Sequence, residues 1–122
     1  MKRLRSLIII FALGALTWGC YYDNEEYLYP QTACDTTNVT FSATVGPIFQ
    51  SNCTQCHNNV SPSGNIDLSS YDGAVAAVNT GRLLGAINHE QGYSWMPKNA
   101  DQLSPCTITQ ITIWINAGTP NN

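Results

Sequence analysis

Basic side chains are scarce in this sequence of 122 residues, which contains five Lys and Arg against eight Asp and Glu. Three of the five lie within the first five positions, and the rest of the chain carries only Arg82 and Lys98. Without residues 1–19 the formal net charge at neutral pH is −6. A surface of this sign repels the phosphates of nucleic acids. The composition therefore excludes nucleic acid as a partner and favours proteins with a basic docking surface.

Long apolar runs and catalytic arrangements are also missing. The apolar stretch Leu7–Leu16 is far shorter than the ~20 residues with which a helix crosses a bilayer. The sequence has no Ser/His/Asp set and no pair of carboxylates at a spacing suited to acid–base catalysis. We therefore expect no enzyme active site. The alternative to a cleaved export segment is a membrane anchor helix that stays attached.

Residues 1–19 have the pattern of an export signal: a basic start, an apolar centre and small or polar residues that lead to Gly19. The junction with Cys20 resembles the signal of bacterial lipoproteins, in which the cysteine is lipidated and becomes the first mature residue. Thr17 departs from that pattern, which usually has an aliphatic residue there. The resemblance implies a lipid on Cys20 that holds the protein at a membrane. The alternative is ordinary cleavage that leaves Cys20 as a thiol.

The chain divides into three predicted parts, which are a signal peptide over 1–19, a tether over 20–38 and a folded domain over 39–122. The tether is polar, acidic and rich in tyrosine, without regular spacing of apolar side chains, as is typical of a linker. Its acidic start resembles export signals of some surface lipoproteins. We expect an exported, lipid-anchored protein in the periplasm or on the outer membrane or cell surface.

Five cysteines are many for an exported chain of this size. If Cys20 carries lipid, and Cys53 and Cys56 belong to the motif described below, Cys34 and Cys106 remain. Export places them in an oxidising compartment, where disulfides form and persist. By elimination we expect a disulfide between Cys34 and Cys106. Closing a loop of this length would stabilise the fold by about 4 kcal/mol.

The regular structure expected in the folded part is helical, over 44–52, 71–78 and 82–87. Pro47 suits the first turn of the first helix, where its missing N–H is not needed. Ser69 can cap the second helix, with Asp72 three residues later as in a capping box. Residues 58–68 are rich in Ser, Pro, Gly and Asn and predict a loop.

The last segment, 107–115, contains signals for both a strand and a helix. It is crowded with β-branched residues, and its isoleucines alternate as in a strand. Ser104 suits a helix N-cap, however, and Pro105 suits the first helical position. Gly118 suits the position after a helix end. We therefore predict a helix here and an all-α domain.

The segment Cys53-Thr54-Gln55-Cys56-His57 is a C-x-x-C-H motif, the signature of covalent attachment of a c-type haem. The two thiols can form thioethers with the vinyl groups on one side of a porphyrin. His57 then binds the iron through one ring nitrogen, while the other donates a hydrogen bond that fixes the ring. Pro62 is a candidate for the carbonyl that accepts this bond.

Three other interpretations of the motif stay open. A thioredoxin-like redox pair requires a βαβ context, which the sequence lacks. A zinc site normally pairs two well-spaced ligand couples; its candidate ligands are Cys53, Cys56, His57, His89 and Cys106. The third interpretation is a chance occurrence of the motif, or a plain disulfide within it.

Met96 is the candidate for the second iron ligand, because it is the only methionine after the signal segment. Pro97 disfavours helical geometry at Met96 and so predicts a loop. Ligation by His and Met raises the potential of a haem. The alternatives are that Met96 fills the core, or that His89 is the ligand and the haem has two histidines and a lower potential.

These motifs resemble class I cytochrome c domains of exported bacterial proteins, over about 41–118. Phe49 lies four residues before the first motif cysteine, Met96-Pro97 matches the distal-ligand loop, and 111–118 has the form I-x-x-W-I-x-x-G. The resemblance implies a small helical domain around one haem c. It also implies a contact between Phe49 and Trp114 where the first and last helices cross.

We therefore expect an electron carrier whose haem iron is held by His57 and Met96. The alternatives are a haem protein that binds or senses a gas, and a haem-free lipoprotein that uses its thiols for exchange or zinc. A domain this small buries only a modest core, so a haem would provide an apolar plate for packing. The side chains expected against it are Ile48, Phe49, Leu68, Leu83, Leu84, Ile87, Trp95 and Ile111.

Overall fold

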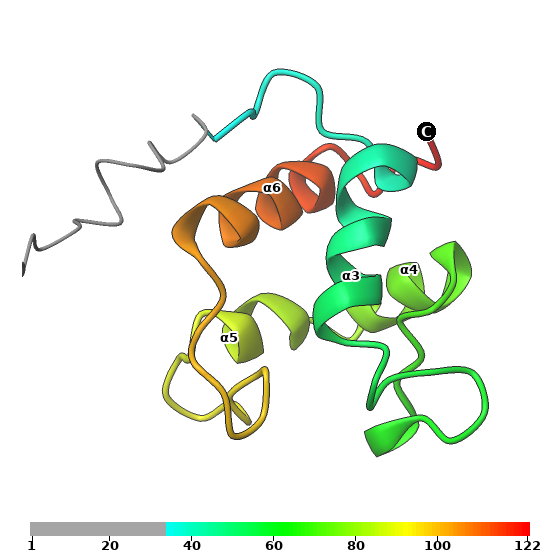
Figure 1. Ribbon diagram of the computed structural model, residues 1–122, viewed down its shortest axis with the longest axis vertical. Coiled ribbons are helices and arrows are strands. Elements are labelled where there is room, and N and C mark those ends of the chain that lie inside the picture. The colour runs from blue at the N-terminus through cyan, green and yellow to red at the C-terminus, as the bar shows by residue number, and fades with distance from the viewer. Residues whose placement is uncertain (1–33) are drawn as a thin grey trace, which may run out of the picture. The chain divides into compact units, whose positions relative to one another are not determined.

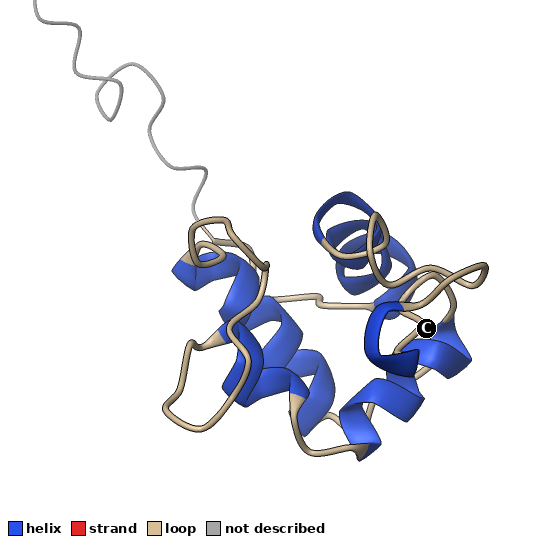
Figure 2. Cartoon of the chain, turned by 90° about the horizontal axis from the view of Figure 1, so that it is seen from below, coloured by secondary structure: helices blue, strands red, loops and turns tan. Residues whose placement is uncertain are grey.

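The structure, a computed structural model, describes residues 34–122, which form helices and loops without any strand (Figures 1 and 2). The elements in chain order are η1 (Phe41–Val45), α3 (Gly46–Asn52), η2 (Ser63–Asn65), α4 (Tyr71–Asn79), α5 (Leu83–Ile87) and α6 (Pro105–Asn116). The all-α prediction is confirmed for this part of the chain. The signal segment, Cys20 and most of the tether lie outside the described residues. Within 34–122, no helix has the length and apolar character that crossing a bilayer requires.

The first helical segment begins earlier than predicted, because Thr40 caps it. The Thr40 hydroxyl accepts a hydrogen bond from the Ala43 amide, which satisfies one of the free donors at a helix start. A π-helical turn, η1, then leads directly into α3. Pro47 lies in the first turn of α3, as predicted. The helix ends at Asn52, immediately before the C-x-x-C-H motif.

The cap of α4 is Ser70, so the prediction of Ser69 is wrong by one position. The Ser70 hydroxyl accepts a hydrogen bond from the Gly73 amide. Ser69 is engaged elsewhere, because its amide and hydroxyl both donate to the Asp67 carboxylate, at 2.8 and 2.6 Å. These two bonds hold the pKa of Asp67 below its ordinary value, with the hydroxyl contributing most.

The last segment is a helix, as its end signals predict. The Ser104 hydroxyl accepts a hydrogen bond from the Thr107 amide, and Pro105 occupies the first turn of α6. Gly118 follows the end with a φ of 85°, a conformation that glycine adopts without steric cost. The predicted turn at 82–87 is also present as α5, with Arg82 at its N-cap position.

The core is small and lies between these helices. Its buried side chains are Val45, Phe49, Leu68, Ala74, Ala77, Ile87, Ile111 and Trp114. Phe49 and Trp114 meet edge to face, with ring centroids 6.4 Å apart, so the predicted contact between α3 and α6 is confirmed. An aromatic pair of this kind adds about 0.5–1.5 kcal/mol beyond the burial of its area. Phe41 packs on the same indole at 5.4 Å.

The residues that follow α6 connect three elements by hydrogen bonds. The Trp114 indole N–H donates to the Pro120 carbonyl at 2.9 Å, and the Tyr71 hydroxyl donates to the Thr119 carbonyl at 2.7 Å. The Phe41 amide donates to the Asn122 side chain at 2.8 Å. This segment therefore fixes α6, α4 and η1 to one another.

A disulfide joins Cys34 to Cys106, with Cα atoms 5.5 Å apart. It connects the segment before η1 to the first turn of α6. From the same helix, the side-chain amide of Gln110 donates to the Asp35 carbonyl at 3.0 Å. Both contacts hold residues 34 and 35 against α6.

Candidate functional site

The C-x-x-C-H motif forms a tight turn directly after α3. The Cys53 amide closes the helix by donating to the Phe49 carbonyl at 2.8 Å. The Cys53 carbonyl then accepts from the amides of Cys56 and His57, at 3.1 and 2.9 Å. One helix end and one carbonyl thus place both thiols and the imidazole on a single turn.

The two thiols of the motif are free and differ in their surroundings. Cys53 packs against the core, whereas Cys56 is exposed. Burial raises the pKa of the Cys53 thiol to about 11, because a thiolate is poorly solvated there. Redox-active C-x-x-C motifs depend on a lowered thiol pKa. The environment of Cys53 is therefore the opposite of that expected for thiol exchange.

The His57 ring is held by the loop that follows it. Its Nδ1 lies 3.2 Å from the Ile66 carbonyl, and because a carbonyl can only accept, Nδ1 carries the proton. In this tautomer of the neutral ring Nε2 keeps a lone pair, as in a metal-binding imidazole. Ile66, and not the predicted Pro62, supplies the carbonyl. The Pro62 carbonyl instead accepts from the Asn65 amide at 3.1 Å, within the η2 turn.

Two backbone contacts return the loop to the motif. The Ser63 amide donates to the Cys56 carbonyl at 2.9 Å, and the Leu68 amide donates to the His57 carbonyl at 2.8 Å. Leu68 is also part of the buried core. The position of the His57 ring is therefore fixed from both sides of the loop and through the core.

Met96 lies in a loop, as Pro97 predicts, and packs partly buried against the core. Its amide donates to the Ala86 carbonyl of α5 at 3.0 Å. The neighbouring carbonyls of Gly85 and Ile87 accept from the Glu90 amide and from a side chain, at 2.9 and 3.1 Å. The carbonyls at a helix end have no partners within the helix. Here residues 88–104 donate to these carbonyls, so this segment, with Met96 in it, is held on the end of α5.

Gly85 allows the Tyr93 ring to lie close to the backbone of α5, a contact that the sequence analysis does not predict. A Cβ atom at Gly85 would lie 2.6 Å from the Tyr93 ring, inside van der Waals contact. The ring therefore packs directly on the backbone of α5. The sequence offers no local signal for this contact, because the two residues are joined only by the path of the loop.

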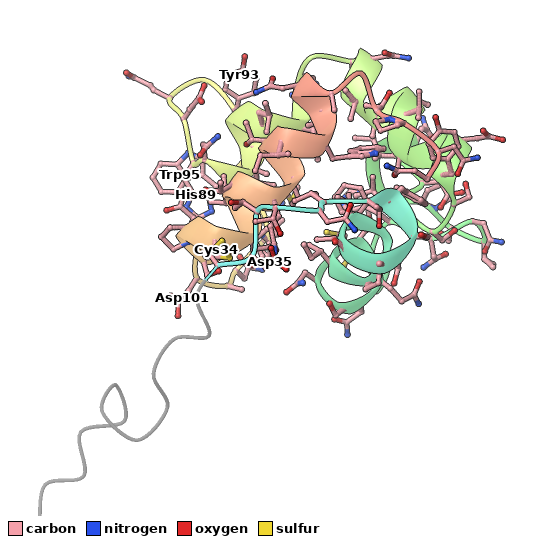
Figure 3. The ribbon with its side chains drawn as sticks, turned by 90° about the horizontal axis from the view of Figure 1, so that it is seen from above. Cys34, Asp35, His89, Tyr93, Trp95 and Asp101 are labelled. Atoms are coloured by element: carbon pink, nitrogen blue, oxygen red, sulfur yellow. A yellow bond between two sulfur atoms is a disulfide. The ribbon has the colours of Figure 1, made fainter. Side chains whose placement is uncertain are left out.

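His89 contacts Met96 through the backbone. Its Nε2 lies 3.1 Å from the Met96 carbonyl, and its ring stacks on Trp95 with centroids 5.0 Å apart (Figure 3). Trp95 in turn donates its indole N–H to the Glu90 carbonyl at 3.2 Å. Trp95 is 58% exposed, so its ring covers His89 and is not part of the protein core.

The motif and the methionine reach the same core from different directions. Figure 1 shows segment 53–70 (green) and segment 88–104 (yellow to orange) on opposite sides of α5. Cys53 and Met96 both pack against the buried cluster.

Most of the hydrophobic side chains expected around a haem lie in or on this core. Eight hydrophobic side chains are buried, and two of these are alanines. Fourteen more pack on them while staying partly exposed. Among the expected haem-packing residues, Phe49, Leu68, Ile87 and Ile111 are buried, and Ile48, Leu83 and Leu84 are partly buried. These residues fit the addition of a flat apolar group.

Residues 34–122 offer little support for a zinc site. Cys106 is engaged in the disulfide and has no thiolate to offer. Within residues 34–122, no three His, Cys, Asp or Glu side chains gather as a metal-binding group.

Comparisons of the chain with protein-family models, curated proteins and solved structures find no match.

Proposed function

We propose that this protein is an electron carrier with one c-type haem, bound through the thiols of Cys53 and Cys56. The observation that carries the proposal is the state of His57. Its Nδ1 is tied to the Ile66 carbonyl and its Nε2 has a free lone pair, in one turn with two free thiols. Each donor that haem c attachment requires is thus present on that turn.

The second ligand in this proposal is Met96. When bound, the haem supplies an iron that alternates between the ferric and ferrous states. His57 and Met96 would hold the iron, and the side chains around them would exclude water. His57 is oriented by Ile66, and Met96 is held on α5 by Ala86. Fixed ligands keep the structural change on electron transfer small, which suits a carrier.

The proposed partners are redox proteins with a basic docking surface. Within the described residues, five acidic side chains stand against Arg82 and Lys98. Complementary charge accelerates encounter between partners without requiring a permanent complex. The proposal places the carrier outside the cytoplasm, held at a membrane by lipid on Cys20. Haem c suits that location, because its covalent attachment prevents loss outside the cell.

Expression with the cytochrome c maturation machinery tests the proposal. The intact mass of the wild type should increase by one haem, and the pyridine haemochrome spectrum should be that of haem c. The Cys53→Ala, Cys56→Ala double variant should lack both signals. The matched control is Cys34→Ser, Cys106→Ser, which also removes two cysteines but should keep the haem. Wild-type protein that stays colourless in a competent host would overturn the proposal.

A further inference from the structure

We propose that His89 is a positioning residue for Met96, and that it acts by holding the backbone from which the thioether projects. The proposal rests on the electron-carrier function above and specifies how its second ligand is kept in place. It also separates the two candidates for that ligand. His89 orients Met96 and does not replace it.

The contact between the two residues sets the proton position on the His89 ring. Nε2 lies 3.1 Å from the Met96 carbonyl oxygen. That oxygen has no proton to donate, so Nε2–H must be the donor. The lone pair of Nε2 is therefore unavailable to iron. This is the reverse of His57, in which Nδ1 donates and Nε2 is bare.

The backbone of Met96 is held on both sides. Its amide donates to the Ala86 carbonyl at 3.0 Å, and its carbonyl accepts from His89. The first bond connects Met96 to α5. The second connects it to His89, in the loop after α5. Both backbone groups of Met96 are therefore fixed, and its side chain packs partly buried against the core.

The His89 ring is itself fixed, so it can transmit this restraint. It lies parallel to the Trp95 ring, at an interplanar angle of 1°. The Trp95 indole N–H is bound to the Glu90 carbonyl. The backbone of His89 has a φ of 55°, in the left-handed region that few residues other than glycine adopt. Figure 3 shows the two rings together at the edge of the domain.

The experiment uses the haem-loaded protein at one fixed neutral pH. Imidazole is titrated into the ferric protein, because it binds iron only when Met96 detaches. Its apparent affinity therefore reports the stability of the Met96 bond. His89→Ala should bind imidazole about 3- to 10-fold more tightly, which is the fold-change equivalent of one lost hydrogen bond. His89→Gln keeps an N–H donor and should stay close to the wild type.

Asn88→Ala is the matched control. Asn88 is the neighbouring residue, and its amide also donates to a backbone carbonyl, but to that of Leu84 at 3.0 Å. Its loss should leave imidazole binding and the weak long-wavelength sulfur–iron absorption unchanged. A nitrogen-15 spectrum of the wild-type His89 ring gives a second measurement that needs no variant. It should show the proton on Nε2.

The outcomes separate the two proposals. A wild type without haem overturns the carrier function and this role with it. A haem-bearing wild type whose His89→Ala variant binds imidazole as before overturns the positioning role alone. The positioning role is also overturned if the wild type lacks the sulfur–iron absorption and the iron loses a ligand in His89→Ala. That result would identify His89 as the ligand. A nitrogen-15 spectrum that places the His89 ring proton on Nδ1 would overturn the positioning role without any variant.

Discussion

His57 and His89 donate hydrogen bonds to backbone carbonyls through opposite ring nitrogens, His57 through Nδ1 and His89 through Nε2. The nitrogen left bare is therefore different in each ring. In His57 it is Nε2, on the side of the ring away from the backbone, where a metal ligand projects furthest. This difference supports the proposed roles, in which His57 would bind the iron and His89 holds the Met96 loop.

The first prediction concerns Met96. In Met96→Ala the haem should remain attached, because the thiols and His57 are unchanged. The weak long-wavelength absorption of the ferric protein should disappear, and the potential should fall, since ligation by methionine raises it. Spectroscopy and redox titration measure both effects.

Ile108→Ala provides the control for this change. Ile108 is another partly buried side chain packed on the same core, so its truncation removes packing without removing sulfur. It should melt at a lower temperature and keep the absorption. Persistence of the absorption in Met96→Ala would show that Met96 is not the ligand.

The parts of the fold that could be predicted are those with local chemical signals. Ser104, Pro105 and Gly118 mark the two ends of α6 within a few residues, and these signals outweigh the β-branched residues between them. Pro47 marks the first turn of α3 in the same way. Each signal acts through hydrogen bonds to its own turn, so it can be read without knowledge of the fold.

The remaining contacts depend on competition or on the path of a loop. The capping-box pattern predicts Ser69 as the cap of α4, but Ser69 donates both of its hydrogen bonds to Asp67 and Ser70 caps the helix. The carbonyl beside His57 is that of Ile66, whereas the Pro62 carbonyl accepts from the Asn65 amide within the η2 turn. Neither the cap of α4 nor the carbonyl beside His57 can be predicted from spacing along the chain.

The second prediction concerns the two motif thiols in protein made without haem. Cys56 is exposed, whereas burial raises the pKa of Cys53 to about 11. Because the thiolate is the reacting form, iodoacetamide should modify Cys56 first at pH 8. Modification of Cys53 should accelerate as the pH rises toward 11. Mass spectrometry of timed samples measures both rates.

The raised pKa also affects stability in the haem-free protein. The native state keeps its proton on Cys53 at pH values where an unfolded thiol, of pKa 9.0, has lost it. This contribution is complete below pH 9 and is lost as the pH rises toward 11. Cys53→Ser should show less of this alkaline loss in thermal melts. Equal modification rates for both thiols at pH 8 would contradict the burial of Cys53.

The third prediction concerns the disulfide. Cys34→Ser, Cys106→Ser opens a loop with a sequence separation of 72 residues, which should lower the free energy of unfolding by about 4 kcal/mol. Chemical denaturation of the haem-loaded protein measures it. The haem spectrum should be unchanged, because the disulfide lies at the start of α6 and not at the motif. A shift of the sulfur–iron absorption would instead connect the disulfide to the Met96 loop.

The last prediction concerns the contact between Gly85 and the Tyr93 ring. Gly85→Ala puts a methyl group 2.6 Å from that ring, so the ring and its loop must move. Overpacking of this kind costs about 1–3 kcal/mol. Tyr93→Ala removes the obstacle, and in the double variant the alanine at position 85 should cost much less. Thermal or chemical unfolding of the four proteins gives the coupling between the two positions.

The same four proteins show whether the contact supports the iron ligand. Tyr93 lies in the loop that returns Met96 to α5, so its displacement by Gly85→Ala should also weaken the sulfur–iron absorption. Tyr93→Ala in that background should restore part of it, since the loop can settle again. Additive losses of stability would show that the ring moves aside freely. The Gly85 position would then not constrain the loop that presents Met96.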